Sequence, residues 1–375
     1  MSTLPTIGII LTPRIGKINT SYPAGTEQLF TRDIQALKKT GYTLHPYARG
    51  YAPVAHSLFY PIKYVTRFLR NESHVNTIET ILETIALSIF CIKTRACGVW
   101  IGYSTPLLAL FRPKRTIIIM QTCFDIPLAR IYASRYQKAH FVFCSQSMQR
   151  DYIKKYSWMN KCSSVLYNSI NTNRFHPEKQ NNRASTLPLH LLFVSAWVPE
   201  KGLDVLLKAL KTLPMHARKN IFLTIASNES LWYSDFPQLN QSFVQRIKRS
   251  IKTGKNIHLL GGVSQSQMPG LYRSHDALVF PSVWAEPFGL SILESLSCGT
   301  PVIAFDSGGI KELLDATKSL LVKSKTPTAL ANSIFYAYNH RNIFQNHDTS
   351  LVSSSRFTDA IRLKKYMNFI YKRTT

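Results

Sequence analysis

Acidic residues are scarce in this 375-residue chain, where 20 Asp and Glu stand against 46 Lys and Arg, a formal net charge of +26. Residues 1–180 are the more basic part, with 23 of the cations and 8 of the acids. Such a charge favours polyanionic partners: nucleic acid, anionic lipid surfaces or phosphorylated small molecules. We expect no nucleic-acid partner, because the chain lacks a recognisable reading motif and an interleaved run of aromatic and basic residues.

Paired metal ligands are also lacking. The six cysteines form no Cys-x-x-Cys pair, and none of the eleven histidines has a metal-ligand spacing. No Asp-x-Asp ends a strand to hold a divalent ion beside nucleotide phosphates. We therefore expect no metal and no cofactor, and a reducing, cytoplasmic location.

Several familiar motifs and segments are absent. The sequence has no Walker loop, no Gly-x-Gly-x-x-Gly and no Gly-x-Ser-x-Gly, which excludes the usual kinases, dehydrogenases and hydrolases. No signal peptide is evident. The apolar stretch 84–92 is far shorter than the roughly 20 residues that a membrane-spanning helix needs, so we expect a buried helix there.

Short apolar runs alternate with amphipathic helical stretches along the chain. This alternation predicts βαβ units, and hence parallel sheets covered by helices. The length predicts two domains facing a cleft. The polar stretch at 178–189 indicates the linker between them, so we expect domains at 1–180 and 181–355. The predicted strands are 7–11, 98–101, 116–120, 141–144, 191–194, 221–225, 257–260, 277–280 and 302–304.

Residues 280–299 carry the most information. A strand is expected to end at Phe280 and a helix to begin near Gly289, with Glu286 just before that helix and Glu294 about two turns inside it. The free backbone N–H groups of Phe288, Gly289, Leu290 and Ser291 would then point into the cleft with the positive end of the helix dipole behind them. This arrangement is suited to binding a diphosphate.

The nine residues EPFGLSILE, from Glu286 to Glu294, resemble the Glu-x7-Glu signature of retaining family-4 glycosyltransferases. The resemblance implies a GT-B fold, in which two Rossmann-like domains with parallel sheets face a cleft and the last helix, 356–375, returns to the first domain. It also implies that Glu286 faces the transferred sugar and that Glu294 holds the nucleotide ribose.

Other segments resemble the same family in order and spacing. Residues 195–202, from Ser195 to the Lys201-Gly202 pair, resemble the Gly-Arg-Leu-x-x-x-Lys-Gly loop that opens the donor domain. Residues 256–264, with Val263, resemble the stretch that packs against the base. Residues 168–177 and 301–312 also match. An ammonium at the start of a helix can neutralise charge on a departing diphosphate, so Lys201 is a candidate catalytic residue.

The sequence departs from the family at three places. The arginine that clamps the phosphates is Ala196 here. The N-terminal glycine pair is Ala24-Gly25, where Gly25 either admits the donor to the backbone or simply opens a helix. The family's histidine near the end of the fourth strand is missing, and Gln121, Cys123 and Asp125 remain alternatives for its place.

The resemblance implies an enzyme that transfers a hexose, with retention and without metal, from a nucleoside-diphosphate sugar to a hydroxyl of a glycan or a lipid-linked glycan. Ala196 and the missing histidine motivate an alternative, a catalytically impaired GT-B protein that binds nucleotide sugars or serves as a partner subunit. An epimerase on the same fold is a further alternative.

One segment bears on a membrane partner. In residues 57–70 the apolar side chains of Phe59, Ile62, Val65 and Leu69 recur at helical spacing beside several cations. The segment either packs into the core of the first domain or lies peripherally on an anionic membrane at its cytoplasmic face.

Overall fold

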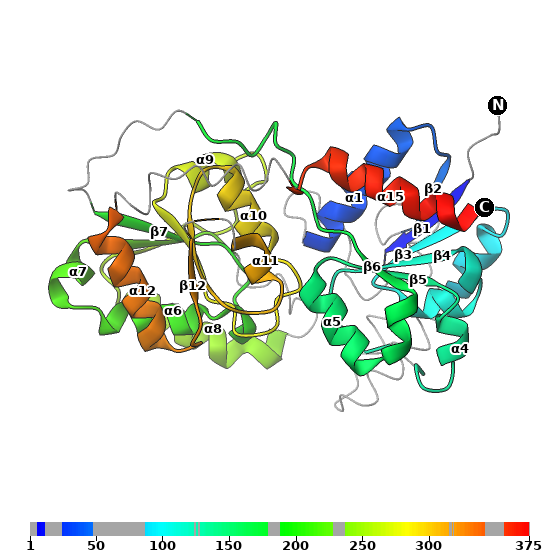
Figure 1. Cartoon of the computed structure of the whole chain (residues 1–375). Helices are drawn as coiled ribbons and strands as arrows, with labels where there is room; N and C mark the ends of the chain where they lie inside the picture. The colour runs from blue at the N-terminus through cyan, green and yellow to red at the C-terminus, as the bar shows by residue number, and fades with distance from the viewer. Residues whose placement is uncertain are drawn as a thin grey trace. The chain divides into compact units, whose positions relative to one another are not determined.

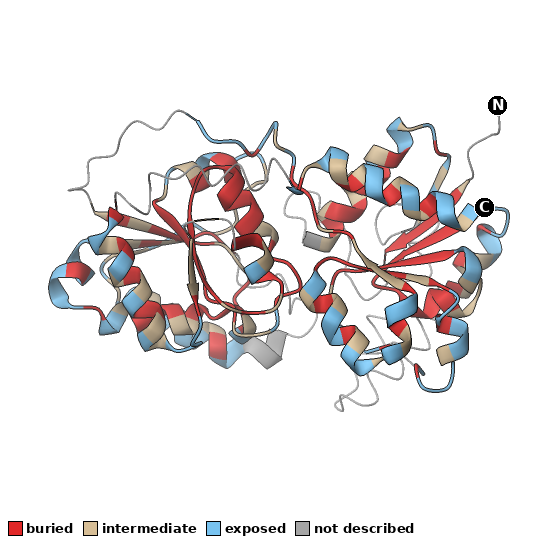
Figure 2. Cartoon of the chain, viewed as in Figure 1, coloured by how far each residue is buried: buried red, intermediate tan, exposed pale blue. Residues whose placement is uncertain are grey.

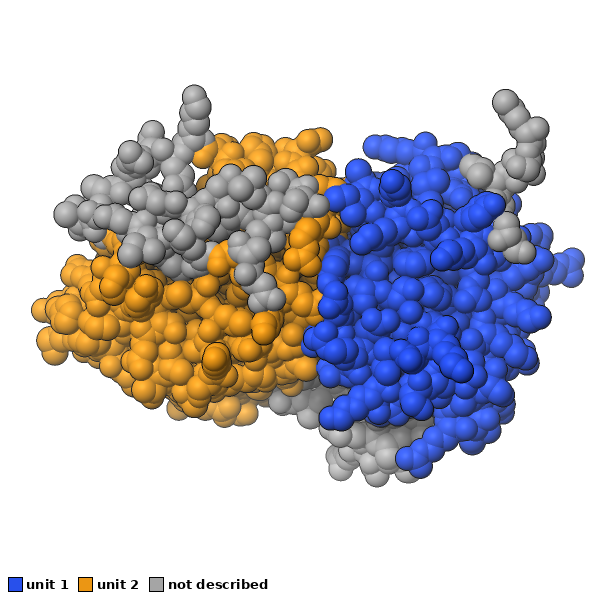
Figure 3. Space-filling view, viewed as in Figure 1, with its two compact units in different colours: residues 1–168, 360–375 blue, residues 169–359 orange. Residues whose placement is uncertain are grey.

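The computed structural model describes residues 6–11, 25–47, 87–123, 125–126, 128–178, 188–227, 237–314, 317, 319–341 and 356–374. The chain divides into two compact units, coloured separately in Figure 3: unit 1 is residues 1–168 with 360–375, and unit 2 is residues 169–359. Segment 57–70 lies outside the described residues.

The boundary between the units differs from the one that composition predicted at 180/181. Unit 2 begins at Ser169, before the polar stretch. The backbone N–H of Ile170 donates to the Phe357 carbonyl at 2.8 Å, and the Phe175 ring lies 6.5 Å from the Tyr272 ring. These contacts tie residues 169–177 to unit 2, which polarity along the chain does not reveal.

Unit 1 contains a six-stranded parallel sheet of order β2-β1-β3-β4-β5-β6 (Figure 1). The strands are β1 Ile7–Leu11, β2 Leu44–Tyr47, β3 Val99–Tyr103, β4 Thr116–Met120, β5 His140–Phe143 and β6 Ser163–Val165. The helices are α1 Gly25–Lys39, α4 Ala133–Tyr136, α5 Gln146–Lys155 and α15 Asp359–Thr374, with short 3₁₀ helices η1 Pro106–Leu110, η2 Pro113–Arg115 and η3 Ser157–Lys161.

The core of unit 1 joins elements from both ends of the chain. Phe30 and Ile34 of α1 pack in one buried cluster with Ile9 of β1 and with Tyr366 and Ile370 of α15. Burial of each side chain of this size contributes about 1.5–3 kcal/mol. The last helix is therefore part of the unit 1 core, and Figure 2 shows its alternation of buried and exposed residues.

Unit 2 contains a second six-stranded parallel sheet, of order β12-β11-β10-β7-β8-β9. The strands are β7 Leu189–Phe193, β8 Ile221–Ile225, β9 Ile257–Leu259, β10 Ala277–Phe280, β11 Val302–Phe305 and β12 Leu320–Val322. The helices are η4 Pro199–Lys201, α6 Leu203–Thr212, α7 Met215–Lys219, α8 Pro237–Lys252, α9 Met268–Arg273, α10 Leu290–Ser297, α11 Ile310–Leu314 and α12 Pro327–Asn339. The two parallel sheets with their helices confirm the predicted α/β class.

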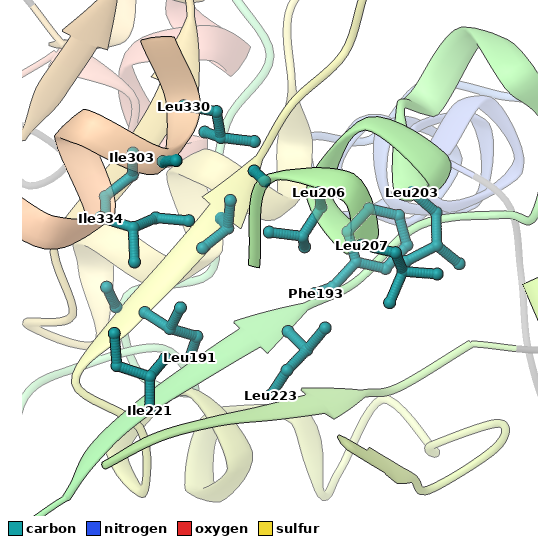
Figure 4. Packing of buried hydrophobic residues seen from close by; sticks show 14 of the residues in the cluster. Leu191, Phe193, Leu203, Leu206, Leu207, Ile221, Leu223, Ile303, Leu330 and Ile334 are labelled. Carbon is teal, nitrogen blue, oxygen red and sulfur yellow. The ribbon is translucent and has the colours of Figure 1, made fainter. Parts of the chain in front are cut away.

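The core of unit 2 lies between its sheet and helices α6 and α12. Leu203, Leu206 and Leu207 of α6 are buried in one cluster with Phe193 of β7 and Leu330 of α12 (Figure 4). The spacing of three and four residues gives α6 one apolar face, and that face covers the sheet. The strands are thereby held with their carboxyl ends at a common edge, from which the loops that carry the predicted site residues emerge.

Candidate functional site

Two loops of unit 2 meet because β7 and β10 are neighbouring strands. The turn after β7 ends at Gly202, which has φ +71°, and a Cβ atom there would lie 2.0 Å from the carbonyl oxygen of Pro281. Across the same contact, the N–H of Val283 donates to the Glu200 carbonyl at 2.9 Å. The close approach that glycine permits brings the adjacent Lys201 to the loop after β10.

Lys201 and Glu286 form a buried ion pair. The distance from Lys201 Nζ to Glu286 Oε2 is 2.7 Å, and the residues are 7% and 8% exposed. The sequence singled out both residues separately, and the structure brings them together. Two charges removed from water need close pairing, and loss of one partner from such a pair typically costs about 3–5 kcal/mol.

Two further donors converge on the same carboxylate oxygen. The indole Nε1–H of Trp284 donates to Glu286 Oε2 at 2.8 Å, and the Ser282 hydroxyl donates to it at 3.2 Å. Lys201 Nζ also lies 4.8 Å from the Trp284 ring centroid, a cation–π distance. Oε2 is thus occupied by protein donors, whereas the described residues supply no hydrogen bond to Oε1. The signature did not indicate the roles of Ser282 and Trp284.

The glycine pair after β11 fixes the backbone of Glu286. The N–H of Gly309 donates to the Glu286 carbonyl at 2.8 Å. Gly308 has φ +59°, and a Cβ atom there would lie 2.2 Å from the same carbonyl oxygen. Lys325 Nζ reinforces this loop by donating to the Val283 carbonyl at 2.8 Å and to the Ser307 hydroxyl at 2.9 Å.

Helix α10 starts at Leu290, directly after Gly289, which has φ +99°. Its first internal bond runs from the N–H of Ile292 to the Gly289 carbonyl at 3.1 Å. The described part of the chain records no partner for the N–H groups of Gly289, Leu290 and Ser291. These amides lie three to five residues after Glu286 and can receive an anion.

Phe288 precedes the helix, and its ring is buried against that of Phe357, with centroids 5.8 Å apart. Its side chain therefore belongs to the core, and only its backbone remains a candidate donor-binding group.

Glu294 lies inside α10 and is 6% exposed. The Tyr272 hydroxyl of α9 donates to Glu294 Oε2 at 2.8 Å. Burial, and then the neighbouring Glu294 carboxylate, raise the pKa of Tyr272 well above its usual value, so this hydroxyl remains a donor. The hydrogen bond from Tyr272 orients the Glu294 carboxylate inside the helix.

The remaining predicted donor residues follow strands of unit 2, apart from Gly25 in unit 1. Half-buried Ser195 follows β7, and half-buried Val263 follows β9. Ala196 is buried and supplies no charge. Trp197 is fully buried, and its Nε1–H donates to the Ser227 hydroxyl at 2.6 Å, so it is a core residue. Gly25 belongs to unit 1, where it is the first residue of α1.

In unit 1 the three alternatives for the missing histidine differ in their exposure and in their hydrogen-bond partners. Cys123 is exposed, and exposed Asp125 pairs with Lys155. Gln121, directly after β4, is 6% exposed and accepts a hydrogen bond of 2.9 Å from the Asn168 amide. Its Nε2 has no partner among the described residues, and neither has Asn168 Oδ1.

A strained turn lies beside Gln121. Ser104, directly after β3, has φ +53°, which is uncommon for a residue other than glycine. Its hydroxyl accepts from the Gln121 N–H at 3.3 Å and from the Thr122 hydroxyl at 3.2 Å. Buried polar groups without partners cost about 1–3 kcal/mol each, and strained backbone is concentrated at functional sites. Gln121 is therefore the candidate in unit 1.

The described residues lack two further features. Among them, no three His, Cys, Asp or Glu side chains are grouped so that they could hold a metal ion. Within the same residues, no helix has the length and apolarity to cross a membrane.

Most of the second unit resembles a described protein family. Residues 175–349 match the family described as "Glycosyl transferases group 1". An uncharacterized glycosyltransferase of Methanocaldococcus jannaschii is 28% identical over 211 residues, which cover 53% of this chain and 51% of that protein. D-inositol 3-phosphate glycosyltransferase 2 of Catenulispora acidiphila is 29% identical over 181 residues, which cover 46% and 41%. The chain spans about half the length of the curated relatives that it matches, or less.

A solved structure resembles the whole fold. Anabaena HepE in complex with UDP and glucose superposes with a TM-score of 0.71 at 16% identity, over 98% of this chain and 100% of that one. At this identity the likeness concerns the fold, which is that of the GT-B glycosyltransferases. Residues 175–349 thus match the glycosyl transferases group 1 family, and the chain has the two-domain GT-B fold.

Proposed function

We propose that this chain is a retaining glycosyltransferase that moves a hexose from a nucleoside-diphosphate sugar to a hydroxyl of a glycan or a lipid-linked glycan. The observation that carries the proposal is the buried Lys201–Glu286 pair, with Nζ and Oε2 2.7 Å apart, directly before the unpartnered amides of Gly289, Leu290 and Ser291. A cation and helix N-terminal amides suit a diphosphate, and the adjacent carboxylate suits a sugar. The names of the curated relatives support sugar transfer as the reaction class.

The proposed reaction breaks the bond between the anomeric carbon and the diphosphate oxygen. A bond forms from the acceptor oxygen to the same face of the anomeric carbon, and the acceptor proton passes to the departing phosphate. Lys201 and the amides of residues 288–291 stabilise the charge on the leaving diphosphate. Glu286 orients the sugar through Oε1, since Oε2 accepts from Ser282 and Trp284 and, until the diphosphate draws the ammonium away, from Lys201.

The other proposed contacts follow from position. Glu294 accepts hydrogen bonds from the ribose, with its carboxylate held by Tyr272. Ser195 and Val263 lie on loops at the same edge of the sheet and line the donor. In unit 1, Gln121 offers an amide N–H to a substrate hydroxyl, and Gly25 admits the substrate to the start of α1.

Metal-independent transfer and a cytoplasmic location are parts of the same proposal. Lys201 and the helix amides supply the positive charge that a divalent ion otherwise supplies to a diphosphate. All six cysteines are free thiols, which suits a reducing compartment. Turnover with each nucleotide sugar should therefore be the same with and without EDTA.

The test is Glu286→Gln in a screen of nucleotide sugars for transfer to glycan and lipid-extract acceptors. Glutamine keeps the shape but removes the charge that faces the sugar, so turnover should fall by more than about tenfold, which is about 1.4 kcal/mol of barrier. Binding of the free nucleoside diphosphate should persist. Retention of a tenth or more of the activity contradicts the role of Glu286.

A second candidate function is favoured by Ala196, which is buried and uncharged where the family has a phosphate-clamping arginine. Loss of a charge-assisted bidentate contact costs about 1.5–3 kcal/mol, so a nucleotide-sugar binder without turnover is the alternative. Donor binding together with no nucleotide release for any acceptor supports it.

A further inference from the structure

An exposed apolar turn stands out on unit 1. Leu128 is 53% exposed, Ile131 is 73% exposed and Tyr132 is 42% exposed, all within five residues. The turn leads into α4 (Figure 1), and exposed residues are pale blue in Figure 2. Single exposed apolar residues are ordinary on protein surfaces, but three large ones gathered on one turn indicate an interaction site.

The turn is held in place by its own backbone and by anchors on its inner side. The N–H groups of Ile131 and Tyr132 both donate to the Leu128 carbonyl at 3.0 Å, and that of Ala129 donates to the Ile126 carbonyl at 3.2 Å. Leu128 itself has φ +53°, a conformation in which a non-glycine residue is strained.

On the inner side, Ile126 and Tyr136 are buried, and the Tyr136 ring stacks on Trp158 with centroids 5.9 Å apart. These contacts fix the turn with its three large apolar side chains pointing outward. The exposure of Leu128, Ile131 and Tyr132 is therefore a feature of the ordered fold.

The sequence that follows Asp125, which contains the turn, is positively charged. Between Asp125 and Asp151 the sequence has four Lys and Arg residues and no acidic residue. Arg130 is exposed within the turn, and Lys138 is exposed two residues after the end of α4. Arg135 instead donates to the carbonyls of Leu110 and Phe111, so it fixes the base of α4.

We propose that Leu128, Ile131 and Tyr132, with Arg130 and Lys138, dock unit 1 onto an anionic lipid bilayer. The three apolar side chains enter the boundary between headgroups and acyl chains, Tyr132 keeps its hydroxyl at the headgroup level, and the two cations contact lipid phosphates. The combination of outward apolar anchors and uncompensated cations fits a bilayer, since a bilayer presents both an apolar interior and a negative surface. The surface binds lipid without substrates, so its test is separate from that of the transferase proposal.

The experiment measures partitioning of the full chain onto vesicles by flotation. One set of vesicles is phosphatidylcholine alone, and the other contains equal parts of phosphatidylcholine and phosphatidylglycerol. We expect binding to the anionic vesicles that weakens as salt is raised. Leu128→Ser with Ile131→Ser should lower the partition coefficient by about tenfold or more, and Arg130→Ser with Lys138→Ser by about tenfold.

Ile92→Ser is the matched control, because Ile92 is 68% exposed in unit 1 and is not one of the turn residues 128–132. It should change partitioning by less than about twofold. Unchanged thermal unfolding of every variant excludes misfolding as the cause. Partitioning of the Leu128/Ile131 variant equal to that of Ile92→Ser overturns the proposal. So does equal binding to both vesicle types, or a switch from dimer to monomer in the variant with no change in vesicle binding.

Discussion

Gly308 lies against the carbonyl oxygen of Glu286 so closely that a Cβ atom on it would be 2.2 Å away. The glycine therefore sets the position of the proposed catalytic carboxylate through the backbone. Gly308→Ala must push the two loops apart, and it also strains a residue at φ +59°. We expect turnover to fall by about a hundredfold, which is about 2.7 kcal/mol of barrier, with a loss of about 1–3 kcal/mol of stability.

Two other glycines separate the effect of backbone strain from the effect of the steric clash with Glu286. Gly261 has φ +80° with open space around it, so Gly261→Ala tests backbone strain alone in the unfolding measurement. Gly270 lies inside α9 with open space and no positive φ, so Gly270→Ala should leave turnover unchanged and raise stability by about 0.5–1 kcal/mol. Full activity in Gly308→Ala would show that the close approach does not position Glu286.

Tyr272→Phe removes the hydroxyl that donates to Glu294 Oε2 at 2.8 Å. A buried carboxylate that loses one charge-assisted hydrogen bond is less well oriented, at a cost of about 1.5–3 kcal/mol. The dissociation constant of the nucleoside diphosphate, measured by calorimetry, should rise by about tenfold or more. Tyr338→Phe provides a tyrosine control elsewhere in unit 2, and equal affinities in the two variants would remove Tyr272 from the donor site.

Arg362 of α15 pairs with Asp33 of α1, with both residues buried and Nη2 to Oδ2 at 2.6 Å. Arg362→Met leaves the Asp33 charge buried without its cation, so unfolding in urea should show a loss of about 3–5 kcal/mol. Adding Asp33→Leu should recover much of that loss, because no unpaired charge then remains. Lys208→Ala, at an exposed pair, should cost under about 1 kcal/mol. A double variant less stable than Arg362→Met would refute the buried-charge explanation.

His140 makes unit 1 sensitive to acid. Burial, and then the nearby Arg373 and Lys372, lower the pKa of His140 to about 4, and its ring packs on Phe369 of α15. The folded state favours the neutral ring relative to an unfolded pKa near 6.5. The resulting stability is complete above about pH 6.5 and is lost as the pH falls through about 4, up to about 3 kcal/mol. In His140→Gln the free energy of unfolding should fall less between about pH 6.5 and pH 4. An unchanged fall over this range would exclude His140 as its source.

The interior strands and the edge strand β9 were predictable from the sequence, and the other three edge strands were not. The predicted strands 7–11, 116–120, 221–225 and 277–280 coincide with β1, β4, β8 and β10. The strands that the pattern missed, β2, β6 and β12, all lie at sheet edges. β2 contains Pro46, which an edge strand tolerates, and β6 is Ser-Ser-Val. An edge strand needs no apolar run, because one side of it has no neighbouring strand.

The candidate site was predictable in its parts and not in its assembly. The motifs selected Glu286 and Lys201, but their direct pairing depends on the neighbouring places of β7 and β10 in the sheet, which spacing along the chain does not encode. Trp284 and Ser282 converge on Glu286 through the shape of one loop. Gln121 was one of three alternatives until burial and an unpartnered amide distinguished it.

The Lys201–Glu286 pair makes the carboxylate an internal competitor for the cation that the proposed donor needs. A diphosphate that enters must draw the ammonium away from Glu286, and this displacement offsets part of the attraction. An intact nucleotide sugar offsets part of this cost, because its hydroxyl groups donate new hydrogen bonds to the released Glu286 carboxylate. A product that has lost its sugar cannot do so. The same two side chains that hold the loops together would thereby favour binding of intact donor over retention of spent nucleotide.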